Sequence, residues 1–131
     1  MIRKQFTLYL ENRAGALAKA TRILALMKIN IEGISVSEST DVGLVQIVVN
    51  DAVATRKALS KARIPYTIQD VAMLTLRNEP GALHKIVSRL AKAGVNINYI
   101  YGTNCNYGAD GIVIVSAPDL KKLETTWKAI S

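Results

Sequence analysis

The sequence predicts an α+β fold of two tandem ferredoxin-like βαββαβ units, each an antiparallel sheet with both helices on one face. Residues 12–17 recur as residues 78–83, an offset of 66 (78 − 12), and neighbouring positions keep this offset. In each copy the apolar residues alternate, then recur every three or four positions, then alternate again, which indicates strand, helix and strand. We therefore expect one unit at residues 1–70 and a second at residues 71–131.

The first unit carries the signals of each element in turn. Alternating apolar residues predict its strands, and a stripe at three-and-four spacing predicts its first helix. Gly43 marks a hairpin turn, Asp51 can cap the second helix, and Pro65 ends that helix before the last strand. The expected elements are a strand at 6–10, a helix at 17–27, strands at 31–36 and 44–49, a helix at 52–62 and a strand at 66–70.

The second unit repeats this order without an evident last strand. Because the last strand of this topology lies beside the first, its absence would open the backbone edge of residues 71–76, which proteins normally cover. Either another part of this chain covers that edge, or a partner strand does, or the unit is a shortened one. The expected elements are strands at 71–76, 97–101 and 112–115 and helices at 83–90 and 120–130, with hairpin turns between Gly108 and Gly111.

The size and the charge of the chain limit which partners we expect it to have. A unit of roughly 65 residues buries only about 60% of its unfolded surface, so we expect a homodimer or a higher homo-oligomer. The net charge of +7 would attract polyanions, but the Lys and Arg residues are scattered. That scatter favours solvated helix faces, with a functional basic surface as the alternative. The central strands lack the aromatic residues on which RNA recognition motifs stack bases, so we expect no nucleic-acid partner.

The sequence gives little support for catalysis, metal binding or a membrane location. It has one histidine, His84, and one cysteine, Cys105, with no Ser-His-Asp, HExxH or Walker pattern, so we expect no enzyme activity and no cofactor. The lone cysteine excludes an intramolecular disulfide and a CxxC metal site. No apolar stretch is long enough for a signal peptide or a membrane span, so we expect a cytoplasmic protein.

The turn between the first strand and the first helix of each copy is the most informative feature for function. Gly15 and Gly81 let the backbone turn tightly and approach a ligand, and the following helix offers unpaired amides to a carboxylate. Asn12 and Asn78 add an amide that can both donate and accept hydrogen bonds. An amino acid needs this combination. The alternative is that Asn and Gly only form the turn, as they do in many proteins.

Residues 11–17, 78–83 and 90–97 resemble the ACT domain family, whose members bind amino acids and regulate metabolic enzymes. The second copy has the family's Asn-x-Pro-Gly-x-Leu turn, and the first has Ala14 in place of the proline. The resemblance implies that two units pair through their second strands and that an amino acid binds at the seam, between the turn of one unit and the second-strand start of the other. The implied ligand-binding residues are Asn12, Arg13, Ala14, Gly15, Ala16, Leu17, Asn30, Ile31, Asn78, Glu79, Pro80, Gly81, Ala82, Leu83, Asn96 and Ile97.

The resemblance therefore implies a non-catalytic regulatory protein that binds a free amino acid. An alternative is a regulatory subunit that docks on an amino-acid biosynthetic enzyme. The second copy is also similar to the regulatory subunit of acetolactate synthase, although that subunit is not simply two such repeats.

Overall fold

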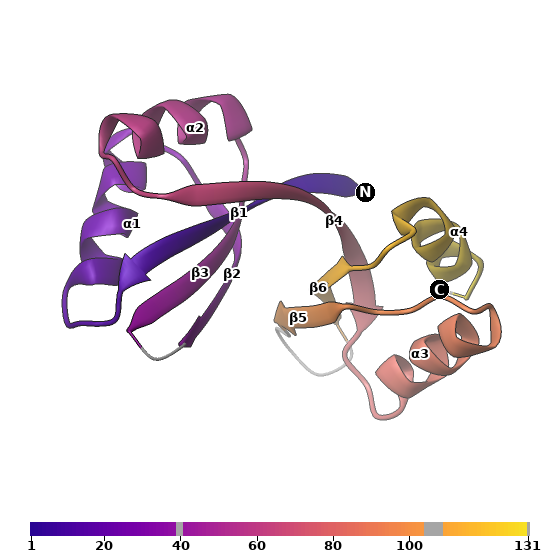
Figure 1. The fold of residues 1–131 in the computed structure, drawn as a ribbon. Helices are drawn as coiled ribbons and strands as arrows, with labels where there is room; N and C mark the ends of the chain where they lie inside the picture. Colours follow the sequence, from indigo (N-terminus) through magenta and orange to yellow (C-terminus); the bar gives the residue numbers. More distant parts are fainter. Residues whose placement is uncertain (39–40, 104–108, 131) are drawn as a thin grey trace. The chain divides into compact units, whose positions relative to one another are not determined.

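The computed structural model describes residues 1–38, 41–103 and 109–130, which form six strands and four helices (Figure 1). They confirm the predicted fold class, because the element order is βαββαβ followed by αββα. The elements are β1 (Ile2–Glu11), α1 (Ala16–Leu26), β2 (Ile31–Glu38), β3 (Val42–Val49), α2 (Ala52–Lys61), β4 (Tyr66–Arg77), α3 (Ala82–Lys92), β5 (Tyr99–Thr103), β6 (Asp110–Ser116) and α4 (Leu120–Ile130).

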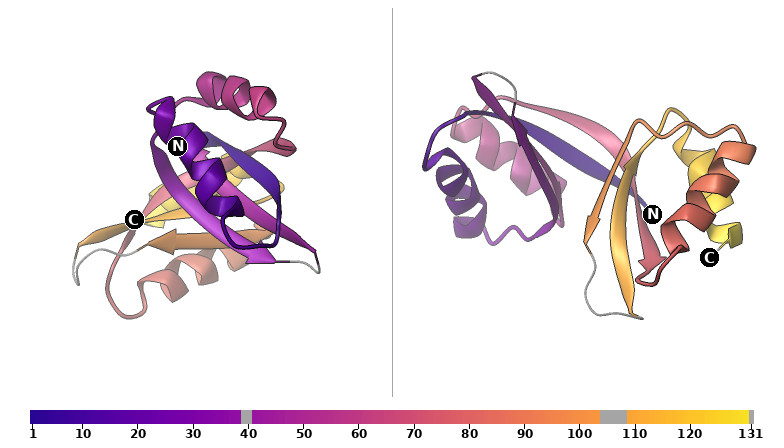
Figure 2. Two further views of the ribbon diagram at one scale, coloured as in Figure 1. Left: turned by 90° about the vertical axis from the view of Figure 1, so that its left-hand side faces the viewer. Right: turned by 90° about the horizontal axis from the view of Figure 1, so that it is seen from below.

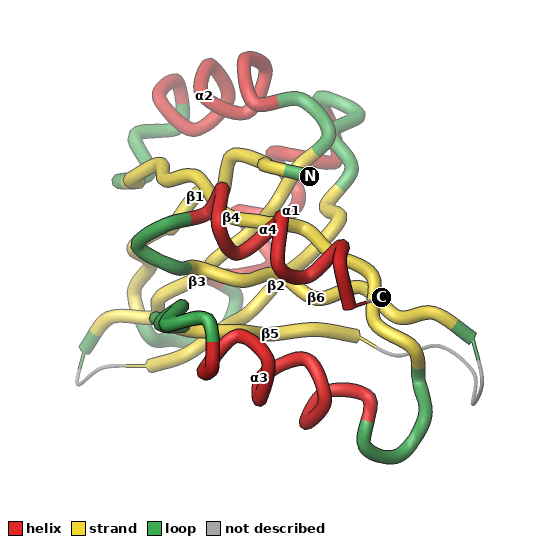
Figure 3. The backbone as a smooth tube through the Cα atoms, turned by 90° about the vertical axis from the view of Figure 1, so that its right-hand side faces the viewer, coloured by secondary structure: helices red, strands yellow, loops and turns green. Residues whose placement is uncertain are grey.

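The chain folds into two compact units. The first unit comprises Lys4–Gln69, and the second comprises Met1–Arg3 together with Asp70–Ser131. Hydrogen-bonded strands follow the order β2-β3-β1-β4 in the first unit and β4-β6-β5 in the second. Within each unit the two helices contact each other and lie on one face of the sheet (Figures 2 and 3).

Three predicted strands differ from those observed. The strands expected at 66–70 and 71–76 are one continuous strand, β4, because no turn-forming residue separates them. The strand expected at 97–101 is β5, which starts at Tyr99, because Ile97 packs against the core and precedes the ladder. Asp51 caps α2 as predicted, since its carboxylate accepts a hydrogen bond from the Ala54 amide at 3.0 Å.

The strand register relates the two copies position by position. Leu8 pairs with Val45 in the first unit, and Leu74 pairs with Val113 in the second. The offset between copies is therefore 66 before the hairpin (74 − 8) and 68 after it (113 − 45), so the second hairpin is two residues longer. Cys105 and Gly108, which the sequence analysis singled out, lie outside the described residues, whereas Gly111 pairs with Leu76.

Each unit has its own core between its sheet and its helices, and the two cores are filled differently. Phe6 of β1 and Leu59 of α2 are fully buried in the first unit. The equivalent residues of the second unit are Ala72 and Trp127, which are also buried. A large ring thus enters the core from the strand in one unit and from the helix in the other, which keeps the core volumes similar.

The edge of β4 that the sequence left open is covered by this chain. Met1 exchanges two backbone hydrogen bonds with Met73, since the Met73 amide donates to the Met1 carbonyl at 2.7 Å and the Met1 nitrogen donates to the Met73 carbonyl at 3.2 Å. Two residues further along the same edge, the Trp127 indole Nε1 donates to the Thr75 carbonyl at 2.9 Å. A backbone segment and a side chain together do what the last strand does in the first unit.

An ion pair holds this N-terminal segment in place. The Met1 ammonium contacts the Glu124 carboxylate, and Lys128 lies 3.9 Å from the other oxygen of that carboxylate. The Met1 ammonium beside it lowers the pKa of Glu124 below its usual value. None of the described helices is long and apolar enough to cross a membrane.

Candidate functional site

The two predicted turns have the same backbone geometry. In the second unit the Glu79 amide donates to the Arg77 carbonyl at 3.0 Å, and the Lys85 amide donates to the Gly81 carbonyl at 3.0 Å. The first unit makes both bonds between residues 66 positions earlier, each at 2.9 Å. Gly15 has φ 88° and Gly81 has φ 85°, so both turns need the left-handed region that favours glycine. Replacing proline by Ala14 leaves the turn geometry unchanged.

Both turns leave the start of the following helix open. Neither α1 nor α3 has a side-chain cap, and neither has an acidic residue in its first turn. A Cβ at Gly15 or Gly81 would meet no heavy atom within 4 Å, so the backbone there is accessible. The first amide of each helix donates back into the turn, from Ala16 to the Arg13 carbonyl at 3.3 Å and from Ala82 to the Glu79 carbonyl at 3.2 Å. The amides of the next residues and the positive end of the helix dipole are the groups that an anion such as a carboxylate can use.

The asparagines of the turns are tied to the neighbouring hairpins. The Asn12 amide donates to the Asp41 carbonyl at 3.3 Å, and its side-chain Nδ2 donates to the Glu38 carboxylate at 3.1 Å. The Asn78 amide donates to the Ala109 carbonyl at 2.9 Å. Each turn therefore lies at the hairpin end of its own sheet.

The second group of predicted site residues lies at the other end. The Asn30 backbone amide does not contact the turn. It donates to Asn50 Oδ1 at 2.9 Å, just beyond the end of β3 that lies far from the turn. Asn96 Nδ2 donates to Asn98 Oδ1 at 3.4 Å. Ile31 and Ile97 are half-buried and pack against the cores of their units. Within one unit the structure does not bring this group together with the turn.

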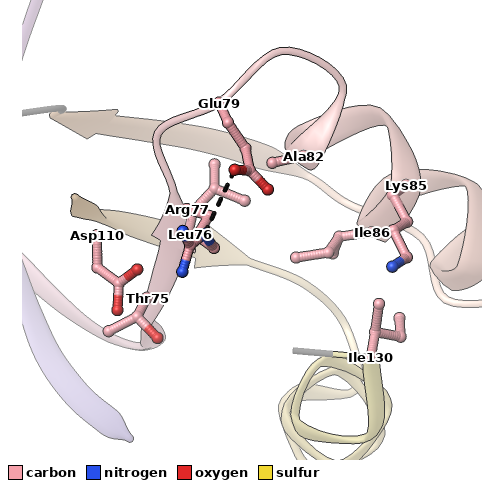
Figure 4. Close-up of a pocket in the computed structure, with 9 residues that line it drawn as sticks. All are labelled: Thr75, Leu76, Arg77, Glu79, Ala82, Lys85, Ile86, Asp110 and Ile130. Carbon is pink, nitrogen blue, oxygen red and sulfur yellow. Dashed lines mark ion pairs between the residues drawn. The ribbon is translucent and has the colours of Figure 1, made fainter. Parts of the chain in front are cut away.

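A pocket of about 430 Å³ lies beside the turn of the second unit (Figure 4). Two of its residues, Glu79 and Ala82, were predicted from the sequence. Lys85, Ile86 and Ile130 come from the helices on one side, and the strands supply the opposite side. The lining residues are Thr75, Leu76, Arg77, Glu79, Ala82, Lys85, Ile86, Asp110 and Ile130.

The pocket exists because the two units differ at the last strand. In the first unit the Tyr9 amide donates to the Pro65 carbonyl at 3.0 Å, and the Tyr66 ring packs on Phe6 with ring centroids 5.6 Å apart. The start of β4 therefore fills this place. Thr75 is the residue of the second unit equivalent to Tyr9. The Thr75 carbonyl accepts a hydrogen bond from the indole of Trp127, a residue of α4, and not from a further strand. The space beside Leu76 and Arg77 stays open.

The pocket carries charges of both signs. Arg77 lies 3.4 Å from the Glu79 carboxylate, and both side chains remain about half exposed. Lys85 and Asp110 are also exposed; Lys85 lies on the helix side of the pocket, and Asp110 lies on the strand side, directly opposite Arg77 in the β4–β6 register (Figure 4). Its floor is apolar, because Leu76 and Ile86 are buried. Such a surface can hold a small molecule that has an apolar part and a charged group.

Sequence reasoning missed Arg77, Lys85, Asp110 and Ile130, because these residues come from four separate elements. A signal was nevertheless present in the aligned copies. Glu11 replaces Arg77 at the equivalent position of the first unit, and Val42 and Ala62 stand where the second unit has Asp110 and Ile130. Positions at which the repeats differ in charge or size mark the pocket.

Substitution of Gly81 by alanine should destabilise the protein by about 1–2 kcal/mol, because a Cβ is disfavoured at positive φ even where space is free. Chemical denaturation followed by circular dichroism measures this. Gly43→Ala is the matched control: its φ is ordinary and its nearest contact would be 3.8 Å away, so we expect a smaller loss. Equal losses in both variants would contradict the strain at the turn.

Other side chains of interest do not gather into a site. His84 is exposed and its Nε2 lies 3.3 Å from Ser88 Oγ one turn further along α3. Tyr99 and Tyr101 stack on β5 with ring centroids 6.4 Å apart, and burial raises the pKa of Tyr101. Among the residues that the structure describes, no three His, Cys, Asp or Glu side chains are placed to hold a metal ion.

Comparisons with known proteins agree with this architecture. The structure is similar to that of a protein from Bacteroides thetaiotaomicron, with a TM-score of 0.91 and 31% identity over 98% of this chain and 88% of that chain. It is also similar to the regulatory subunit of aspartate kinase from Thermus thermophilus in its ligand-free form, with a TM-score of 0.75 and 18% identity over 99% and 95% of the two chains.

A third similar structure is aspartokinase III from E. coli in complex with lysine and aspartate, with a TM-score of 0.57 and 17% identity over 98% of this chain and 32% of that chain. At these identities the two kinase structures show a shared fold alone. No curated protein sequence matches this chain. The sequence profile of the ACT domain pair matches residues 1–126, and with the two βαββα repeats and their glycine turns it shows that the chain belongs to the ACT domain pair family.

Proposed function

We propose that this chain is a non-catalytic regulatory protein that binds a free amino acid and adjusts the activity of a metabolic enzyme in the cytoplasm. The observation that carries the proposal is the pair of matching turns, each with an uncapped helix start behind a glycine at positive φ. Uncapped amides favour a carboxylate. Membership of the ACT domain pair family supports a regulatory role, and one protein of similar fold binds lysine and aspartate.

The proposed ligand contacts are the turn residues 12–17 or 78–83 of one unit and residues 30–31 or 96–97 of another. Since one unit holds these groups at opposite ends of its sheet, a complete site needs two units. A free amino acid has about ten heavy atoms, so micromolar binding, about −8 kcal/mol, requires nearly −1 kcal/mol per atom. Only an enclosed site provides that, so we expect ligand binding and homodimer formation to be linked.

A thermal-shift screen of the twenty amino acids tests the proposal. A ligand that binds only the folded protein stabilises it by about 2.7 kcal/mol at one hundred times its Kd, which raises Tm by several degrees. The amide of the same amino acid, which has no carboxylate, is the matched control and should give little shift. The absence of a shift with all twenty amino acids would overturn the proposal.

A second candidate function is that of a subunit that docks on a biosynthetic enzyme, of which acetolactate synthase is one example. The charge distribution favours it: α1 carries two Lys or Arg residues and the other three helices carry three each, whereas Glu124 is the one acidic residue in these four described helices. All these basic side chains are exposed, so the helix face of each unit complements an acidic surface. Co-purification with a catalytic partner that dissociates in salt would favour this role over a freestanding sensor.

A further inference from the structure

We propose that a groove between α3 and α4 is a docking site for an acidic amphipathic helix of a partner protein. The inference rests on the docking role given above as the second candidate function. It adds the unit that docks, the residues that make the contact and the chemistry of the partner. All residues of the groove belong to the second unit, so no other unit is needed to form its walls.

The groove lies between two helices that contact each other on one face of the sheet (Figure 3). A hollow of about 490 Å³ separates their second halves. Ile130 lines this hollow and also the pocket of about 430 Å³ beside the turn, so the two meet at that residue and form one groove along α3. The hollow is lined by Arg89, Lys92, Ala93, Thr126, Ala129 and Ile130.

One wall of the groove is a row of three basic side chains on α3. Lys85, Arg89 and Lys92 follow one another at intervals of four and three residues (89 − 85 and 92 − 89), so they share one face of the helix. All three are exposed, and none of them pairs with a carboxylate of the described residues. Their positive charge is therefore available to a partner.

The acidic residues nearest to the groove do not cancel this charge. α3 itself has no acidic residue. Glu79 lies 3.4 Å from Arg77, and Asp110 lies opposite Arg77 in the register of β4 and β6. Glu124 of α4 contacts the Met1 ammonium. Each of these carboxylates thus has a positive group beside or opposite it already.

Beside the basic row the groove is apolar. Ala93, Ala129 and Ile130 line it, and Thr126 is the one polar residue that α4 contributes to the hollow. The two alanines are small and leave room for a larger side chain. An apolar side chain of a partner that fills this room is stabilised because it leaves water.

The first unit lacks the basic row. Ile23 and Leu26 stand where the second unit has Arg89 and Lys92 (89 − 66 and 92 − 66). Positive charge near the C-terminus of a helix is favourable, but α1 forms without a basic residue in its last turn. The fold therefore does not require the row, and we expect one docking site per chain.

The spacing of the row favours a helix as the occupant. Lys85 and Lys92 are about 10 Å apart along the axis of α3. Carboxylates at the same four-and-three spacing on another helix span the same length, and a neighbouring apolar stripe of that helix can pack into the groove. A nucleic acid would supply negative charge but no aliphatic side chain for the apolar strip beside Ile130.

Binding of designed peptides to the full chain tests the inference. The probe is a fluorescein-labelled peptide of about 15 residues, long enough to form a helix, in which Glu residues at four-and-three spacing flank a stripe of Leu. Fluorescence anisotropy should show binding that weakens as salt is added. A peptide with Gln in place of Glu loses the charges, and one with Ala in place of Leu loses the apolar contact. Each should bind about tenfold more weakly.

Two double substitutions test the location. Arg89→Gln with Lys92→Gln should weaken binding of the Glu peptide by about tenfold, the loss expected for two exposed ion pairs. Lys57→Gln with Lys61→Gln, on α2 of the first unit, is the matched control, because it removes the same charge from exposed positions. Its affinity should stay within about twofold of the unaltered chain, since charges away from the groove are screened. Circular dichroism establishes that both variants are folded.

The opposite results overturn the inference. Equal affinity of the two double variants would show that the groove is not the site, and equal affinity of the Glu and Gln peptides would show that the partner need not be acidic. Tighter binding of a single-stranded RNA that depends on Arg89 and Lys92 would make the groove a nucleic-acid site instead.

The same experiments keep this inference apart from the proposed function. If the Glu peptide fails to bind while an amino acid still raises the Tm of the chain, the groove assignment is wrong and the regulatory role stands. A catalytic partner that co-purifies equally well with the Arg89→Gln and Lys92→Gln double variant would place the docking role on another surface and overturn the groove assignment alone.

Discussion

Substitution of Trp127 by alanine should destabilise the second unit by about 3–5 kcal/mol, the largest effect expected of any single change described here. Trp127 is fully buried against Leu74, Leu90 and Leu123, and no other large ring enters this core, at least among the described residues. Its indole also donates a hydrogen bond to the Thr75 carbonyl. Urea denaturation followed by far-ultraviolet circular dichroism measures the loss, since the variant has no tryptophan fluorescence.

Two further variants separate the causes. Trp127→Phe keeps most of the packing and removes the donor to Thr75, so we expect a loss of about 1–3 kcal/mol. Lys121→Ala, at an exposed position of the same helix, should change stability by less than about 0.5 kcal/mol. A Trp127→Ala variant as stable as Lys121→Ala would show that Trp127 does not anchor this core.

Deletion of Ile2 and Arg3 should give the second-largest effect. The shortened β1 would no longer reach Met73, so two backbone hydrogen bonds worth about 0.5–1.5 kcal/mol each would be lost. The exposed edge of β4 would also become able to pair with another chain. We expect a stability loss of about 1–3 kcal/mol in denaturation and concentration-dependent association in size-exclusion chromatography.

Glu124→Gln is the control for the ionic part of this contact, because it keeps the strand and removes the charge. The pKa of Glu124 is lowered in the folded protein, so its stabilising effect is present at neutral pH and is lost as the pH falls below 4.5 and through the folded value. The stability difference between Glu124→Gln and the unaltered chain should therefore disappear in acid. A deletion variant with unchanged stability and no association would contradict a structural role for Met1–Arg3.

The repeat and the two periods of its apolar residues were enough to predict most of the fold. Residues such as Leu8, Leu74 and Leu90 are buried because the period of each element places them on its core face. The turns were predictable for a local reason, since Gly15 and Gly81 adopt backbone angles that other residues rarely adopt. The family could be inferred from the same short segments.

Long-range contacts could not be predicted in this way. Nothing in the sequence near Met1 indicates that it lies beside Met73, and no periodicity links Trp127 to the Thr75 carbonyl. The pocket was equally unpredictable, because its lining residues come from separate strands and helices, with Thr75 and Ile130 more than fifty positions apart.

The sequence by itself thus determined most of the elements, their order, the duplication and the glycine turns, because each depends on residues close together in the chain. Only the tertiary structure decided which segment covers the edge of β4 and which side chains from strands and helices surround a common space. Those outcomes depend on packing between residues more than fifty positions apart, such as Thr75 and Trp127, and local patterns do not encode such distances.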